Sequence, residues 1–411
     1  MSRPSALSHP VSTAGFSSLP LTRRQVLGAA AGIGAGVATA GRRPALAGPA
    51  PLKIGFMLPY SGTYAALGHN ITDGFKLRLA ALNNRLGGRE VELVLLDDES
   101  APPKAKDNAA RLILKEKVQV LVGTVHSGVA EAMVQVAREE GILTFIPNAG
   151  SNKLTREHCL PTVFRTSFSN WQLNYPAGVV VRNDNHKNVV LMTWNYAAGK
   201  EMMGAFKESF LAAGGVIVKE FYPDFPKDEF QPYLTEIAAL RPDAVYAFFS
   251  GGGTLKFLKD YAAAGLQGKT PLYGPGFLTD GVLEAAGAAA EGVKTTLHYA
   301  PTLDIPANHR FRAAFRQATT RETDSFAVQG YDTCSLLAHG LEAVQGDLAA
   351  GTPLIQALES ASLESPRGPL TLSRAHNPIQ NIYLRQVRNG VEVVLGVAHA
   401  ALADPGSGCR L

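Results

Sequence analysis

Cysteines and long hydrophobic runs are both scarce in this sequence. Its 411 residues include three cysteines, Cys159, Cys334 and Cys409, and their spacing matches no zinc-binding pattern. The weakly apolar segment at residues 26–41 contains five glycines, whereas a membrane-spanning helix needs about 20 strongly apolar residues. These two features argue against a structural zinc site and against a spanning helix over residues 26–41.

Acidic residues are absent from the first 47 positions, which hold five arginines. Arg23 and Arg24 stand directly before the Gly/Ala-rich run, and ALA at residues 45–47 has the small-residue pattern of a signal-peptide cleavage site. This order predicts a twin-arginine export signal over residues 1–47, and hence a periplasmic protein. A Sec signal or a retained anchor is the alternative.

The positive net charge belongs mainly to this N-terminal segment. Removing residues 1–47 takes the formal charge from +4 to −1. A nucleic-acid-binding protein needs a concentrated basic surface, so no nucleic-acid partner is expected. No cysteine follows the cleavage pattern, which argues against a lipid anchor there.

The three cysteines are not equivalent. Cys334 lies between GYDT and SLLAHGL, a setting typical of a buried helix residue. In an oxidising compartment the other two, Cys159 and Cys409, are the plausible disulfide, which would tie down the C-terminal tail. Three free thiols remain the alternative.

Short apolar strands alternate with helical segments after residue 47, and the order occurs twice. The first series runs from residue 52 to 150, and the second from 188 to 279. Strand, helix, strand in this rhythm predicts parallel sheets covered on both faces. The fold class is therefore α/β, with two similar lobes in tandem.

The loops that follow the predicted strands are rich in Gly, Ser and Asn and carry aromatic residues. In open α/β sheets, ligands bind beyond the carboxyl ends of the strands. Two such loop sets facing each other would form a cleft that closes by hinge motion. The loops are residues 59–68, 123–128 and 147–152 in the first half, and 194–201, 248–253 and 274–279 in the second.

Eight motifs, in order, carry a family resemblance: LPYSGTYAALG, VGTVHSGVA, IPNAGSNKLT, VFRTSFSNWQ, WNYAAGKE, PDAVYAFFSGGG, YGPGFLTDG and VQGYDT. Together they resemble the branched-chain amino-acid-type solute-binding proteins of ABC importers, which are bilobed periplasmic receptors. The resemblance covers nearly all of the chain after the signal. It implies a type I periplasmic binding protein fold, a monomer without cofactor, and delivery of a ligand to membrane permease subunits.

The resemblance also implies how the chain is divided. Two Rossmann-like lobes would be joined by three crossovers, near residues 164–169, 299–302 and 366–372. Lobe one would comprise residues 48–167 plus 302–366. Lobe two would comprise 168–301 plus 367–411.

The residues of several motifs look most like those of the branch of this family that binds aromatic acids. Amino-acid binders of the family carry an acidic residue in a G-P-E-like loop, which holds the ammonium group. This chain has Gly276 and Phe277 in that loop, and the next acidic residue is Asp280. A small organic anion without an amine is therefore expected, such as a benzoate or hydroxycinnamate, with Phe277 packing on its ring. A branched-chain amino acid or aliphatic amide is the alternative.

A carboxylate site is expected where strands meet helix starts in lobe one. Ser127 follows a strand and begins a helix, whose N-terminus favours an anion. A simple N-cap role is the alternative for Ser127. By the resemblance, Asn148, Ala149 and Ser151 in the next loop add contacts to the ligand carboxylate.

The apolar part of the ligand would contact aromatic and aliphatic side chains. The resemblance places Tyr64 and Leu67 from the first loop there, with Tyr196 closing over from lobe two and Tyr331 facing the cleft. Further possible contacts are Trp194, Gly276 and Asp332. For Asp332, support of its helix is the preferred role.

The first crossover and the residues just beyond it contain three more possible contacts. Arg165 could pair with a carboxylate, but arginines at this position commonly bond backbone carbonyls, and that structural role is preferred. Trp171 and Gln172 could line the hinge side of the pocket.

The adjacent pair His126-Ser127 raises the question of catalysis. A nucleophile elbow requires G-x-S-x-G, and here Val125 and Val129 occupy the glycine positions. No catalytic residue or metal site is therefore expected, and His126 is either a donor on the cleft wall or a structural residue. A serine hydrolase and a ligand-sensing ectodomain are the remaining alternatives.

Overall fold

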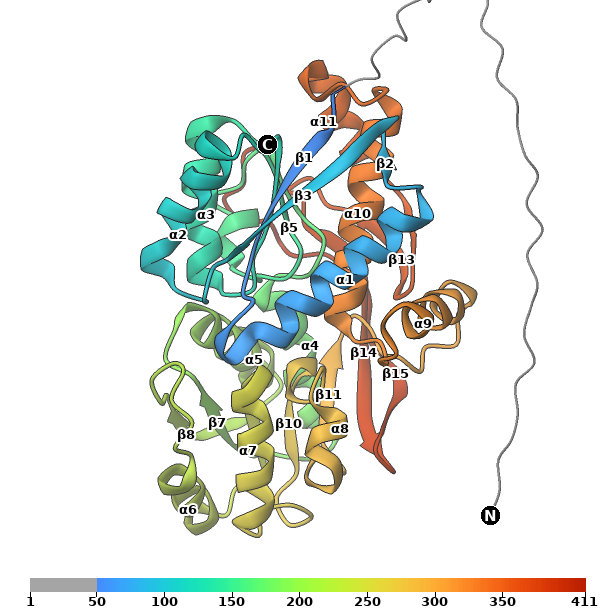
Figure 1. Cartoon of the computed structure of the whole chain (residues 1–411). Helices are drawn as coiled ribbons and strands as arrows, with labels where there is room; N and C mark the ends of the chain where they lie inside the picture. The colour runs from blue at the N-terminus through green and yellow to red at the C-terminus, as the bar shows by residue number, and fades with distance from the viewer. Residues whose placement is uncertain (1–49) are drawn as a thin grey trace, which may run out of the picture. The chain divides into compact units, whose positions relative to one another are not determined.

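The computed structural model describes residues 50–411 (Figure 1). The predicted export signal, residues 1–47, lies outside them. Within residues 50–411, no helix combines the length and the apolar character needed to cross a membrane. The described chain forms two α/β lobes, each built on its own sheet.

Lobe one is built on a six-stranded sheet with the order β2-β3-β1-β4-β5-β6. The central strand β1 pairs in parallel with β3 and β4. It is almost wholly buried, as expected for a sheet covered on both faces. The short β2 pairs antiparallel with β3. The strands are β1 (Leu52–Leu58), β2 (Arg85–Leu86), β3 (Arg89–Asp97), β4 (Val120–Gly123), β5 (Leu143–Ile146) and β6 (Val163–Arg165).

Helices from two distant parts of the chain cover this sheet. α1 packs against α10, and Gly74 allows the close approach, because a Cβ there would lie 1.9 Å from the Ala327 carbonyl oxygen. The elements are η1 (Gly62–Tyr64), α1 (Ala65–Ala81), α2 (Pro102–Ala110), η2 (Arg111–Lys115), α3 (Ser127–Glu140), η3 (Asn152–Thr155), α9 (Pro306–Thr319), α10 (Ser325–Ala343), η6 (Leu348–Ala350) and α11 (Thr352–Glu359).

Lobe two is built on a larger sheet with the order β12-β13-β14-β11-β10-β9-β7-β8, and β15 pairs with β14. The strands from β8 to β11 pair in parallel, whereas β14 is antiparallel to β11. The strands are β7 (Asn188–Thr193), β8 (Val216–Phe221), β9 (Ala244–Phe248), β10 (Leu272–Pro275), β11 (Lys294–Leu297), β12 (Leu363–Ser365), β13 (Gly368–Leu372), β14 (Pro378–Arg388) and β15 (Val391–Leu402).

The helices of lobe two follow the parallel strands, as the sequence pattern predicts. The exception is α4, which lies between β6 of lobe one and β7 and begins with a capping box formed by Ser169 and Gln172. The helices are α4 (Asn170–Asn183), α5 (Ala197–Ala212), α6 (Gln231–Leu240), α7 (Gly251–Ala263), η4 (Gly276–Leu278), α8 (Leu283–Ala286) and η5 (Gly287–Ala290).

The C-terminal tail returns to lobe one, although the predicted boundaries assign it to lobe two. Cys159 and Cys409 form a disulfide, and Arg156 pairs with Asp404 at 2.9 Å. Cys334 is a buried free thiol in α10. The tail therefore lies against the segment that leads from β5 to β6 (Figure 1).

Candidate functional site

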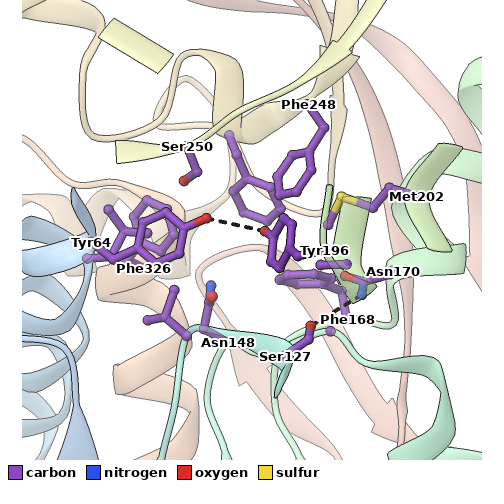
Figure 2. Close-up of a pocket in the computed structure, with 15 residues that line it drawn as sticks. Tyr64, Ser127, Asn148, Phe168, Asn170, Tyr196, Met202, Phe248, Ser250 and Phe326 are labelled. Carbon is purple, nitrogen blue, oxygen red and sulfur yellow. Dashed lines mark hydrogen bonds between the residues drawn. The ribbon is translucent and has the colours of Figure 1, made fainter. Parts of the chain in front are cut away.

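A small cavity lies where the carboxyl ends of the two parallel sheets meet (Figure 2). Both lobes contribute to its wall, and none of the side chains that line it is formally charged. The lining residues are Tyr64, Leu67, Val125, Ser127, Asn148, Gly150, Phe168, Asn170, Tyr196, Ala198, Met202, Phe248, Ser250, Phe277 and Phe326. Six of them were singled out from the sequence: Tyr64, Leu67, Ser127, Asn148, Tyr196 and Phe277.

Ser127 and His126 have different tasks at the start of α3. The Nδ1 atom of His126 accepts a hydrogen bond from the Gly128 N–H at 3.1 Å, so His126 is the N-cap of the helix. Burial lowers the pKa of His126 to about 4, which keeps the ring neutral and able to accept. Ser127 is consequently not the cap, and its hydroxyl faces the cavity (Figure 2).

His126 is packed behind the cavity wall. Its ring lies 5.0 Å from the ring of Tyr196 and 5.1 Å from that of Phe225. Since Nδ1 already accepts from the backbone and the ring does not line the cavity, this histidine is a structural residue. Nothing in this arrangement makes His126 a base for Ser127.

Two side-chain amides, those of Asn170 and Asn148, line the same cavity as Ser127. Asn170 Nδ2 lies 3.4 Å from the Ser127 hydroxyl and donates to Glu201 at 2.7 Å, while Asn170 Oδ1 has no partner. Asn148 donates to Gln329 at 2.7 Å, which fixes its amide at the cavity edge. Burial raises the pKa of Glu201. This end of the cavity therefore offers hydroxyl and amide groups held by a second layer of hydrogen bonds.

Phenylalanine rings form much of the remaining wall. Phe277 lies 5.1 Å from Phe168, 6.1 Å from Phe248 and 5.9 Å from Phe326, between ring centroids. Of these four, the sequence identified Phe277 alone. Phe168 and Phe248 lie in motifs already quoted, VFRTSFSNWQ and PDAVYAFFSGGG, but nothing in those motifs distinguishes a cavity ring from a core ring.

Tyr64 and Tyr196 meet across the cavity, one from each lobe. Their hydroxyl oxygens lie 3.2 Å apart (Figure 2). Burial raises the pKa of both phenols, so both remain protonated at neutral pH. The two lobes are thus connected directly over the site.

Three predicted contacts lie elsewhere. Ala149 is buried in the core of lobe one. The Ser151 hydroxyl donates to Glu131 at 2.7 Å rather than facing the cavity. Tyr331 packs on Phe311 of α9, 5.1 Å between ring centroids, and points away from the cleft.

Arg165 of the first crossover and the two predicted contacts just beyond it are structural. Arg165 is fully buried and donates to the Phe168 and Ser151 carbonyl oxygens, in agreement with the preferred role. Gln172 donates to the backbone oxygens of Pro378 and Leu402. Trp171 stacks on Tyr175 and donates to Glu208, outside the cavity.

Two further possible contacts lie outside the cavity lining. The indole N–H of Trp194 donates to the Lys227 carbonyl oxygen at 2.7 Å, and the ring lies 6.3 Å from that of Tyr64. Asp332 pairs with Arg367 at 2.9 Å, both wholly buried, which is the supporting role expected of it.

The loop that differs from the amino-acid binders contains no free acid. Gly276 packs against Arg385 behind the cavity. Arg385 pairs with Asp280 at 2.8 Å and with Glu392 at 3.0 Å, and Asp280 also accepts from the Ser325 N–H. Asp280 is therefore fully engaged and does not face the cavity.

Comparison with known proteins agrees with this fold. A family model described as periplasmic binding protein matches residues 51–392. A Leu/Ile/Val-binding protein homologue from Brucella melitensis is 33% identical over 343 residues, covering 82% of this chain and 87% of the homologue.

Two solved structures from Rhodopseudomonas palustris are also similar. A solute-binding protein of an ABC transporter, in complex with benzoate, is 53% identical with a TM-score of 0.86, covering 88% of this chain and all of that one. Another, in complex with 3,4-dihydroxybenzoic acid, is 31% identical with a TM-score of 0.82, covering 87% of this chain and 99% of that one.

Proposed function

This chain belongs to the periplasmic binding protein family, and we propose that its cavity binds a small aromatic carboxylate for delivery to an ABC importer. The ligand class is that of benzoate and hydroxycinnamate. The observation that carries the proposal is a cavity walled by phenylalanine and tyrosine rings, with the Ser127 hydroxyl at a helix start. Aromatic rings pack well on such walls, and a helix N-terminus favours an anion.

The carboxylate would bind beside Ser127, Asn148 and Asn170. The Ser127 hydroxyl accepts from Asn170 Nδ2 at 3.4 Å and donates to no group among the described residues, so its proton is available to the ligand. The aromatic ring would lie among Phe168, Phe277 and the other rings. This orientation uses the polar end of the cavity for the charge and the apolar wall for the ring.

Amino-acid ligands fit this site less well. An ammonium group needs an acidic partner, and the cavity lining contains none. Asp280, the first acid after the divergent loop, is engaged by Arg385 and the Ser325 N–H. The bound benzoate and 3,4-dihydroxybenzoic acid of the two solved relatives support the aromatic choice.

The cellular setting follows from the same proposal. A twin-arginine signal over residues 1–47 would export the folded protein to the periplasm. There it would act as a monomer, release its ligand unchanged, and dock in its closed form on permease subunits. The position of His126, with Nδ1 occupied by the Gly128 N–H, supports binding without catalysis.

Titration calorimetry tests this function. We expect benzoate, para-hydroxybenzoate or para-coumarate to bind and leucine not to bind. Ser127→Ala should lower the affinity for the aromatic acid by roughly 10- to 100-fold, because it removes a hydrogen bond to a charged group. Ser100→Ala is the control, since that buried hydroxyl has no partner and lies outside the cavity. Binding of leucine without any aromatic acid would replace this function with branched-chain amino-acid transport.

A further inference from the structure

Ser250 is a buried cavity residue whose hydroxyl has no partner. It lines the cavity, is 4% exposed, and makes no hydrogen bond through its side chain. It also stands at the N-cap of α7, where a serine hydroxyl usually accepts from the helix backbone. Here that bond is not made. The hydroxyl therefore remains available to a ligand.

The position of Ser250 mirrors that of Ser127 in the other lobe. Ser127 begins α3 after β4, and Ser250 precedes α7 after β9. Both serines line the same cavity, so the starts of two helices face it from opposite lobes. In Figure 2 the hydroxyl pair of Tyr64 and Tyr196 lies between Ser250 and the Ser127–Asn148 end.

A second polar end changes which ligand fits best. A buried hydroxyl without a partner is unfavourable, so a ligand that supplies one gains affinity. The start of a helix favours an electronegative atom. A phenolic oxygen satisfies both requirements, because it can accept from Ser250 or the helix and can also donate.

We infer that Ser250 is a specificity-determining residue that recognises a ring hydroxyl opposite the carboxylate of the ligand. The inference rests on the proposed function, in which Ser127 holds the carboxylate. It predicts that para-hydroxybenzoate is preferred to benzoate. The hydroxyls of Tyr64 and Tyr196, which lie between the two ends, are further hydrogen-bonding groups along the same line.

Titration calorimetry with three ligands tests this inference. The wild-type protein should bind para-hydroxybenzoate about three- to tenfold more tightly than benzoate, as one neutral hydrogen bond allows. It should not gain affinity for para-methylbenzoate, which has a substituent of similar size without a hydroxyl. In Ser250→Ala the preference should disappear, because para-hydroxybenzoate should then bind no more tightly than benzoate binds to the same variant.

Thr254→Val is the matched control. Thr254 lies one turn further along α7, is fully buried, has an unpartnered hydroxyl, and does not line the cavity. This variant should keep the wild-type preference. Thermal unfolding shows whether each variant is folded.

Different outcomes test the role of Ser250 and the proposed function separately. Equal wild-type affinities for benzoate and para-hydroxybenzoate, or a preference that survives Ser250→Ala, would overturn the role of Ser250 alone. Failure of every aromatic acid to bind the wild-type protein would overturn the proposed function and this inference with it.

Discussion

The hydroxyl oxygens of Tyr64 and Tyr196 lie 3.2 Å apart, although the two residues are 132 positions apart in the chain. Tyr64 belongs to η1, which follows the first strand of lobe one, and Tyr196 precedes α5 of lobe two. Their contact holds the two lobes together over the cavity. It therefore belongs to the closed arrangement, and a separated pair of lobes would lose it.

Tyr64→Phe should weaken ligand binding without greatly changing stability. The substitution removes the hydrogen bond between the lobes, so the closed arrangement loses about 1 kcal/mol. We expect the affinity for an aromatic acid to fall roughly two- to tenfold by titration calorimetry. The fluorescence of Trp194, whose ring lies 6.3 Å from that of Tyr64, provides a second signal of closure.

Tyr60→Phe is the matched control for the tyrosine pair. The Tyr60 hydroxyl lies 2.9 Å from the Thr72 hydroxyl, and both residues belong to lobe one. Its removal should leave the affinity unchanged. An equal loss of affinity in both variants would show that the Tyr64–Tyr196 bond is not specific to closure.

Gly251→Ala should block closure more severely. Gly251 has a φ of +61°, and a Cβ at this position would lie 2.1 Å from the Thr63 carbonyl oxygen of lobe one. The left-handed backbone adds about 1–2 kcal/mol of strain for alanine. We expect the ligand affinity to fall at least about tenfold, because the clash arises where the lobes meet.

Gly252→Ala is the matched control, because it also places an alanine in the first turn of α7 but creates no clash between the lobes. The next position in α7 has ordinary backbone geometry, and its Cβ would approach no atom closer than 3.6 Å. This variant should bind as the wild type does. Wild-type affinity in Gly251→Ala would mean that Thr63 and α7 do not approach each other in the bound state.

The sequence predicts the fold well, because strand–helix alternation and Gly/Ser-rich loops are local patterns. Ser127 is predicted from its position between a strand and a helix, and Tyr196 from the family resemblance. The hydroxyl–hydroxyl contact of Tyr64 and Tyr196, in contrast, depends on how two lobes close, and no local pattern records that.

Tyr331 is predicted to face the cleft, and the structure turns it away from the cleft. α10 begins at Ser325, so Phe326 meets the cavity and Tyr331 comes five residues later. Five residues correspond to about 140° around a helix axis, which turns Tyr331 toward α9 instead. Phe326 itself is indistinguishable in sequence from a core residue.

The buried carboxyl of Asp98 should make stability depend on pH. Burial raises its pKa from 3.8 to about 7, while Thr124 and the Ser100 N–H donate to it. The folded state therefore binds this proton more tightly than the unfolded state does. Its contribution to the free energy of unfolding is complete below pH 4 and is lost as the pH rises through 7.

Asp98→Asn tests this dependence. The substitution keeps an acceptor and removes the titration. The wild type should therefore lose stability between pH 5 and pH 8, and the variant should gain melting temperature relative to it. Over this pH range the free energy of unfolding of the variant should rise relative to that of the wild type by about 1–4 kcal/mol. A difference that stays constant across this pH range would contradict the raised pKa.

The disulfide between Cys159 and Cys409 should stabilise the protein without affecting binding. It joins residues 250 positions apart and fixes the tail beside β5 and β6, away from the cavity lining. Cross-links over long loops typically contribute about 2–4 kcal/mol by restricting the unfolded chain. We therefore expect a reductant to lower the melting temperature of the wild type while ligand affinity is retained.

Two variants serve as controls for the cross-link. Cys409→Ser should melt at that lower temperature with or without reductant. Cys334→Ser should respond to reductant as the wild type does, because Cys334 takes no part in the cross-link. The contrary result is a wild-type melting temperature that stays the same after mass spectrometry has shown the disulfide to be reduced. That result would mean that the Arg156–Asp404 pair alone holds the tail.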